Sequence, residues 1–245
     1  MLQKISVLIT LALGLSAHTL SYAQTNDHIS HETNSRDAQT IVSAETHLKS
    51  TQVLQWIKVP AAFNIPDIGS VNTQDADDID PNEILNIGKE IWKIIEAGQS
   101  VVNVKTDHAT AMPSGVRDWT RMEGWHDPVA RTYSVDLKNG LGLSVVHLEY
   151  TLISIAGGSV NGVGKYLAYV TVQPSLIHIQ WGFNLEASTH VTAVYNKGTH
   201  KNPMAGMQMD IHYEVSSVVS KFQRTDSFAV SGDGTVAFLN QAPVQ

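Results

Sequence analysis

The protein has 245 residues, of which 42% are hydrophobic and 16% are charged, and it contains no cysteine. This composition is typical of a folded globular protein, because disordered chains carry fewer large apolar residues and more charge. The formal net charge of -7 argues against nucleic acid as a partner, which favours a basic surface, and the absence of cysteine excludes disulfide bonds, thiol catalysis and zinc sites built on thiolates.

Residues 1–23 have the pattern of a secretory signal peptide. Lys4 supplies a short positive region, residues 5–15 are almost continuously apolar, and Ser21 and Ala23 place small side chains at positions -3 and -1 of a cleavage site. The apolar run is shorter than the ~20 residues that cross a bilayer as a helix. We therefore expect cleavage at about Ala23 and a product that is secreted or periplasmic.

The chain after this signal divides into an arm and one domain. Residues 24–50 are polar and lack a sustained period, which predicts a flexible arm. Residues 53–71 are apolar but are interrupted by Pro60 and Pro66, which favours an extended segment at the edge of a sheet. Because no second boundary follows, residues 51–245 are predicted to form a single β-rich domain.

Residues 81–97 are predicted to form a helix that packs on a large apolar surface. Asp80 suits the N-cap, Pro81 suits the first helical position, and Glu83 completes a capping box. Gly98 follows as a helix terminator. Large apolar residues recur at helical spacing along one face, and the centre of this stripe consists of Ile84, Ile87, Ile91 and Ile94.

From residue 100 onward the hydrophobic pattern changes to the period of two that strands show. Pro174 is expected to break one strand, and short glycine-rich links between strands predict antiparallel pairing. Alternate positions that include Trp181 and Val219 are expected to share the apolar face of their strands. The longest strands are predicted at 143–155, 165–172, 176–185 and 207–219.

The expected fold is therefore mainly β (α+β). It consists of one N-terminal helix packed on a large antiparallel sheet or sandwich of about seven to nine strands. The chain lacks the Gly-x-Ser-x-Gly, Gly-x-x-x-x-Gly-Lys and Gly-x-Gly-x-x-Gly motifs of common enzyme classes. We therefore expect a protein that is not an enzyme, although catalytic groups assembled from distant residues leave no such motif.

Histidines and carboxylates lie at alternating strand positions, out of phase with the apolar residues. If their strands are neighbours, imidazoles and carboxylates converge as a divalent transition metal or an acid–base pair requires. The alternative interpretation is the solvated face of a one-sided sheet, which also shows polar residues at period two. The candidate residues are His147, Glu149, His178, Asp210, His212 and Glu214.

The segment 117–128 concentrates tryptophan and arginine in a predicted loop. Arginine makes bidentate contacts with anionic groups, and tryptophan stacks on sugars or cations or lies at a lipid interface. In the alternative, structural interpretation, the two tryptophans close one end of the sheet, with the arginines in salt bridges nearby. The candidate ligand or membrane contacts are Arg117, Trp119, Arg121, Trp125 and His126.

Three functions stay open at this point. The first, which we favour, is an exported non-enzymatic β-protein that binds a protein, a glycan or a membrane surface. The second is a membrane-acting secreted protein, such as a component of a toxin system, motivated by segment 117–128 and by the long amphipathic strand predicted over 208–225. The third is an enzyme that uses a divalent metal at the His/carboxylate cluster. Apart from that metal, no cofactor is expected.

Overall fold

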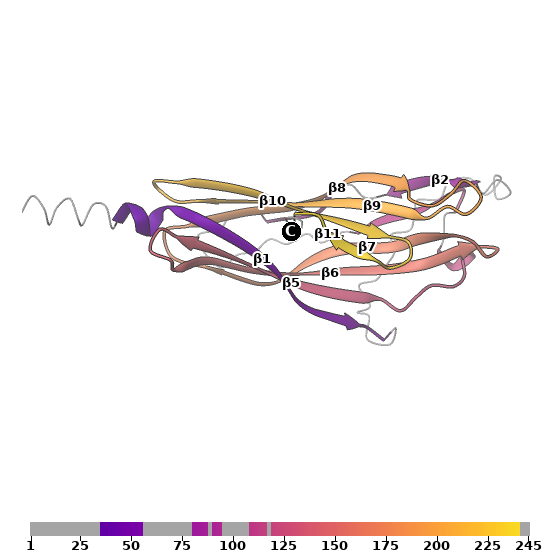
Figure 1. Ribbon diagram of the computed structural model, residues 1–245, viewed down its shortest axis with the longest axis horizontal. Helices are drawn as coiled ribbons and strands as arrows, with labels where there is room; N and C mark the ends of the chain where they lie inside the picture. The colour runs from indigo at the N-terminus through magenta and orange to yellow at the C-terminus, as the bar shows by residue number, and fades with distance from the viewer. Residues whose placement is uncertain (1–34, 56–79, 88–89, 95–107, 117–118, 241–245) are drawn as a thin grey trace, which may run out of the picture.

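The computed structural model describes residues 35–55, 80–87, 90–94, 108–116 and 119–240. In these ranges the chain forms two antiparallel sheets stacked face to face, with a short helix over residues 35–39 at one end (Figure 1). No helix in the described ranges has the length and apolarity that crossing a bilayer requires.

The two sheets contain long strands that all pair in antiparallel fashion with their neighbours. The larger sheet has six strands in the order β1-β5-β6-β7-β4-β2. They are β1 (Ile41–Val53), β2 (Asp80–Ile87), β4 (Ala109–Ser114), β5 (Val129–Asn139), β6 (Ser144–Val160) and β7 (Val163–Ile179). The smaller sheet has five strands in the order β11-β10-β9-β8-β3. They are β3 (Glu90–Ile94), β8 (Asn184–Asn196), β9 (Ala205–Ser216), β10 (Lys221–Ser231) and β11 (Val236–Phe238).

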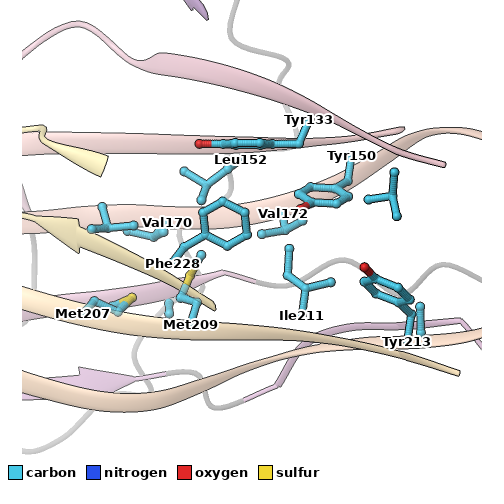
Figure 2. Close-up of a cluster of buried hydrophobic side chains, with 14 of the residues drawn as sticks. Tyr133, Tyr150, Leu152, Val170, Val172, Met207, Met209, Ile211, Tyr213 and Phe228 are labelled. Carbon is cyan, nitrogen blue, oxygen red and sulfur yellow. The ribbon is translucent and has the colours of Figure 1, made fainter. Parts of the chain in front are cut away.

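The hydrophobic core lies between the two sheets. Its residues occupy alternate positions along each strand, because successive side chains of a strand point to opposite faces. Figure 2 shows the centre of the core, where Tyr150 and Leu152 of β6 lie opposite Met209 and Ile211 of β9, with Phe228 of β10 beside them. Each of these side chains is 0% exposed. The mainly β, antiparallel architecture predicted from the alternation is therefore confirmed.

The predicted helix over 81–97 is wrong where the structure describes that range. β2 and β3 cover most of it, with β2 at the edge of the larger sheet beside β4 and β3 at the edge of the smaller sheet beside β8. Both segments are rich in isoleucine, whose branched Cβ favours strands. Pairing with β4 and β8 stabilises the extended backbone of the two segments. The two strands belong to different sheets, β2 to the larger and β3 to the smaller.

Residues 41–50, predicted as part of a flexible arm, form most of β1. This strand pairs with β5 from Ile41 opposite Asn139 to Val53 opposite Val129. Most of its side chains are exposed or half-buried, so hydrophobic periodicity gives little sign of the strand. Residues 1–34, which include the predicted signal peptide and the start of the predicted arm, lie outside the described residues, as does most of the segment 53–71.

Two strand boundaries also differ from the prediction. β7 continues through Pro174, where one extra residue of β7 shifts its register against β6, so the proline lies at a β-bulge and not at a break. The strand predicted over 207–219 ends at Ser216, and a tight turn at 217–220 leads into β10. The polar sequence that follows this turn therefore belongs to a second strand that returns beside the first.

Candidate functional site

The predicted His/carboxylate cluster is divided between the two sheets. The neighbours of these residues along each strand point into the shared core, so the two halves lie on opposite outer faces of the sandwich. Among the described residues, no group of three or more His, Asp or Glu is arranged to hold a metal ion. The six residues therefore do not converge on one common site. The larger sheet carries His147, Glu149 and His178, and the smaller sheet carries Asp210, His212 and Glu214.

On the larger sheet, an ion-paired network joins three neighbouring strands. His147 Nδ1 lies 2.7 Å from Asp136 Oδ1 on β5, and His147 Nε2 lies 3.2 Å from Glu149 Oε1. Glu149 Oε1 also lies 2.5 Å from Lys49 Nζ on β1. The hydrogen bond with Asp136 raises the pKa of His147, and the hydrogen bond from Lys49 lowers the pKa of Glu149. His178, the register partner of His147, is exposed.

On the smaller sheet, the side chains of Glu214 and His212 contact the neighbouring strand β10, whereas Asp210 Oδ1 accepts from Gln208 Nε2 of its own strand at 3.4 Å. Glu214 Oε1 lies 2.7 Å from Lys221 Nζ, and the hydrogen bond from Lys221 lowers the pKa of Glu214. His212 Nδ1 lies 3.1 Å from the hydroxyl of Thr225, its register partner. Cross-strand pairs of this kind are usual on the solvent-exposed face of a sheet. Both outer faces therefore favour the solvated-face interpretation of these polar residues.

The two tryptophans of segment 117–128 cover part of the outer face of the larger sheet. Trp119 begins the short 3-10 helix Trp119–Arg121, and Trp125 Nε1 donates to the backbone oxygen of Trp119 at 3.1 Å. The Trp125 ring covers Gly158, where an added Cβ would come within 2.3 Å of ring carbon. These contacts support the structural interpretation of both tryptophans. The apolar cluster beneath them consists of Ala130, Ile153, Ile155, Ala168 and Tyr169.

The other candidates of this segment are placed differently. Arg121 and His126 are exposed, and Arg117 lies outside the described residues. The backbone N–H of His126 donates to Ala156 O at 2.8 Å, which holds this part of the loop against the end of β6. The loop is therefore attached to the sheet through its backbone as well as through its tryptophans.

A buried carboxylate that the sequence interpretation missed lies between the two sheets. Asp226 of β10 is 0% exposed, and its Oδ2 accepts from the hydroxyl of Thr46 at 2.6 Å and from that of Tyr213 at 3.3 Å. Its Oδ1 accepts from Arg224 Nε at 2.9 Å, and Arg224 also donates to the backbone oxygen of Ala44. Because Ala44 and Thr46 belong to β1, this Asp226 cluster ties the edge strand of the larger sheet to the smaller sheet.

The sequence does contain a signal for the Asp226 cluster. Arg224 and Asp226 occur in the same alternation as the buried residues Phe228 and Val230, which places a charged pair on the inward face of β10. Burial, together with the neighbouring Asp226 carboxylate, raises the pKa of Tyr213, so its hydroxyl stays protonated as a donor. The donors Thr46, Tyr213 and Arg224 replace water around the buried carboxylate of Asp226, which has no surface exposed to solvent.

Three turns come together at one end of the sandwich, and we call them the apolar end. Residues 140–143 join β5 to β6, residues 180–183 join β7 to β8, and residues 217–220 join β9 to β10. The strand registers place these turns at the same end of the molecule, at the left of Figure 1 beside residues 35–39.

The apolar end exposes large apolar side chains and carries no charged residue in its turns. Trp181 is 95% exposed and Val218 is 87% exposed. Leu141, Leu143 and Val219 are 46%, 54% and 49% exposed. The prediction that Trp181 and Val219 lie on buried strand faces is wrong, because both residues lie in turns beyond the ends of their strands.

Glycine allows two of these turns to bend tightly. Gly142 has a φ of 77° and Gly182 has a φ of 90°, in the left-handed region that favours glycine. An added Cβ at either position would meet no atom within 4 Å, so glycine is needed for its backbone conformation and not for its small size. The bends leave the adjacent side chains of Leu141, Leu143 and Trp181 at the tips of the turns.

A scan against protein-family models, a search of curated proteins and a search of solved structures each returned no match for this chain.

Proposed function

We propose that this protein is an exported, non-enzymatic β-sandwich protein that binds a partner through its apolar end. The observation that carries the proposal is the exposure of Trp181, Val218 and neighbouring leucines on adjacent uncharged turns. Single exposed apolar residues are common on protein surfaces, but apolar residues gathered at one place are typical of an interaction site. The apolar end is therefore the part of the described surface best suited to a partner.

The polar features of the described residues support binding in preference to catalysis. Histidines and carboxylates on the outer faces are engaged in pairs within the sheets, such as His147 with Asp136 and Glu214 with Lys221. The Asp226 cluster lies in the interior, where its contacts join the two sheets. The enzyme alternative loses its main support, because its candidate residues lie on opposite faces of the sandwich.

Export is part of the proposal because residues 1–23 match the signal-peptide pattern. In a secreted or periplasmic location, the apolar end meets components of an envelope or a cell surface. These components include proteins, glycans and lipids, which differ in how they recognise an apolar surface.

Retention of envelope fractions tests the proposed function. The purified protein is immobilised and exposed separately to the proteins, the glycans and the lipids of an envelope or host-membrane extract. An apolar-end variant carries Leu141→Ser, Trp181→Ser and Val218→Ser. The matched control carries Val163→Ser and Leu239→Ser, which replace apolar residues that are 37% and 48% exposed outside the apolar end.

We expect the wild-type protein and the matched control to retain the same fraction, and the apolar-end variant to lose it. Equal retention by the apolar-end variant would contradict the proposal, because binding would then use another surface. Failure of the wild-type protein to retain any of the three fractions would contradict it as well.

A further inference from the structure

The backbone N–H groups of the first turn at the apolar end are all hydrogen-bonded within the protein. The four N–H groups of residues 140–143 all donate to internal acceptors. Asn139, which is 2% exposed, accepts from Leu141 N at 3.1 Å and from Leu143 N at 3.0 Å through its side-chain Oδ1. Its backbone oxygen accepts from Gly142 N at 2.9 Å. This turn can therefore leave water without leaving an N–H group unpaired.

The turn at 217–220 uses a serine in the same way. Ser217 Oγ accepts from Val219 N at 3.2 Å and from Ser220 N at 3.1 Å, and Ser217 N donates to Ser220 O at 2.8 Å. The hydroxyls of both serines donate to Gln39 O in the helix over residues 35–39. Unpaired peptide groups are costly in a lipid environment. Internal pairing removes this cost for the four N–H groups of the turn at 140–143 and for those of Ser217, Val219 and Ser220, whereas the N–H groups of Val218, Trp181 and Gly182 point to no internal acceptor among the described residues.

Charged residues stand directly behind the turns of the apolar end. Lys138 comes shortly before the turn at 140–143, and Lys221 follows the turn at 217–220. Acidic residues lie at the same level, among them Asp37, whose backbone oxygen accepts from Gly140 N, and Glu186, which follows the turn at 180–183. Lys221 Nζ lies 2.7 Å from Glu214 Oε1, and the whole chain carries a charge of -7. These charges give no reason to expect a preference for anionic lipid.

We infer that the partner of the apolar end is a lipid membrane, into whose interface the tips of the three turns insert. This inference rests on the proposed function and names its partner. Tryptophan is enriched where membrane meets water, which suits the exposed Trp181, and Leu141 and Val218 are suited to the acyl boundary. A protein partner would need a recess shaped to three separate tips, whereas a lipid surface deforms around them.

Flotation of the purified protein with vesicles of pure phosphatidylcholine tests this inference. We expect the wild-type protein and the Val163→Ser/Leu239→Ser control to bind, with little change between about 0.1 and 1 M salt, because apolar contacts are not screened. The Leu141→Ser/Trp181→Ser/Val218→Ser variant should bind on the order of a thousandfold more weakly, since each of the three large apolar side chains moved out of water contributes about tenfold. Addition of anionic lipid should not strengthen binding.

Two further readouts separate insertion from misfolding. The apolar-end variant should unfold at the same urea midpoint as the wild type, because the replaced side chains are exposed. The change in tryptophan emission that vesicles produce should be smaller in Trp181→Phe than in the wild type, whereas Trp119→Phe should leave it unchanged, because Trp119 and Trp125 lie against the outer face of the larger sheet and away from the apolar end.

The possible failures are distinguishable. If vesicles do not bind the wild type but envelope proteins or glycans are retained through the apolar end, the membrane inference is overturned and the proposed function stands. If neither vesicles nor any envelope fraction binds, both are overturned. Vesicle binding that survives in the apolar-end variant overturns the inference, as does the formation of dimers through the apolar end without vesicle binding.

Discussion

Asp226 is a buried residue through which β1 of the larger sheet is joined to the smaller sheet. It is 0% exposed, and its carboxylate accepts from Thr46, Tyr213 and Arg224. A carboxylate is tolerated in the interior only when donors and a countercharge replace the water that it has lost. Removal of this one side chain therefore affects both sheets at once.

We predict that Asp226→Ala lowers the free energy of unfolding by about 3 kcal/mol or more, because it leaves the Arg224 guanidinium without its buried countercharge. Urea denaturation followed by circular dichroism measures the loss. Asp210→Ala removes a carboxylate from the outer face of β9, and its effect should stay within about 0.5 kcal/mol. Equal effects of the two substitutions would show that the Asp226 cluster does not hold the sheets together.

His147 makes stability depend on pH. Its pKa in the folded protein is raised, mainly by the hydrogen bond with Asp136, above the unfolded value of about 6.5. The protonated ring therefore stabilises the fold fully below that unfolded value, and this contribution is lost as the pH rises through the raised pKa. Because the pair is partly exposed to solvent, we expect no more than about 1 kcal/mol.

The difference in unfolding free energy between wild type and His147→Gln, measured from about pH 5 to 9, isolates this contribution from those of other histidines. We expect the difference to be largest at the acidic end and to shrink towards pH 9. NMR titration of the His147 ring should give a pKa above the unfolded value of about 6.5. A difference that grows as the pH rises would contradict the assignment.

At the scale of elements, β1 is an edge strand held mainly by its backbone and by the Asp226 cluster. It pairs with β5 along its length, and most of its side chains are exposed or half-buried. Its links to the smaller sheet include the hydroxyl of Thr46 on Asp226 and the backbone oxygen of Ala44 on Arg224. An edge strand with so few buried apolar contacts is expected to open more readily than the strands at the centre of its sheet.

We predict that Thr46→Val speeds amide hydrogen exchange in β1 while leaving exchange in the central strand β6 almost unchanged. The substitution keeps the shape of the side chain but removes the donor to Asp226, which should weaken the attachment of β1 by about 1 kcal/mol. Thr51→Val is the matched control, because Thr51 is an exposed residue of the same strand. Equal acceleration in both variants would mean that the change reflects strand propensity and not the lost hydrogen bond.

At the scale of the whole molecule, the two ends of the sandwich differ chemically. The strand β6 begins beside the apolar end at Ser144, and near its other end the ring of Trp125 covers Gly158. Trp119 and Trp125 are half-buried on the outer face of the larger sheet, whereas Trp181 is exposed at the apolar end. Insertion of the apolar end would direct the long strands towards the bilayer and keep the covered tryptophans away from it.

The sequence by itself determined which residues of the central strands face inward. Leu148 and Tyr150, like Ile211 and Tyr213, follow the alternation that strand geometry imposes, and all are buried. This property is local, because it depends on successive residues of one strand and not on the neighbour that the strand meets. For the same reason the antiparallel class of the fold was predictable from short links between alternating segments.

Local pattern was insufficient where two conformations fit the same residues. The isoleucines at 84, 87, 91 and 94 suit the face of a helix by spacing and suit a strand by their branched side chains. Pairing with β4 and β8 decides for strands. Residues 41–50 have little hydrophobic period, and pairing with the backbone of β5, together with the contacts to the Asp226 cluster, makes them a strand.

Only the tertiary structure decided which outward or inward residues become neighbours. Thr46 and Asp226 are 180 positions apart in the chain and meet because β1 and β10 belong to facing sheets. Leu141, Trp181 and Val218 gather at one end because the registers of β5 to β10 align their turns. Alternation specifies the face on which a side chain lies, whereas strand order and register, which depend on contacts between distant segments, specify what it meets there.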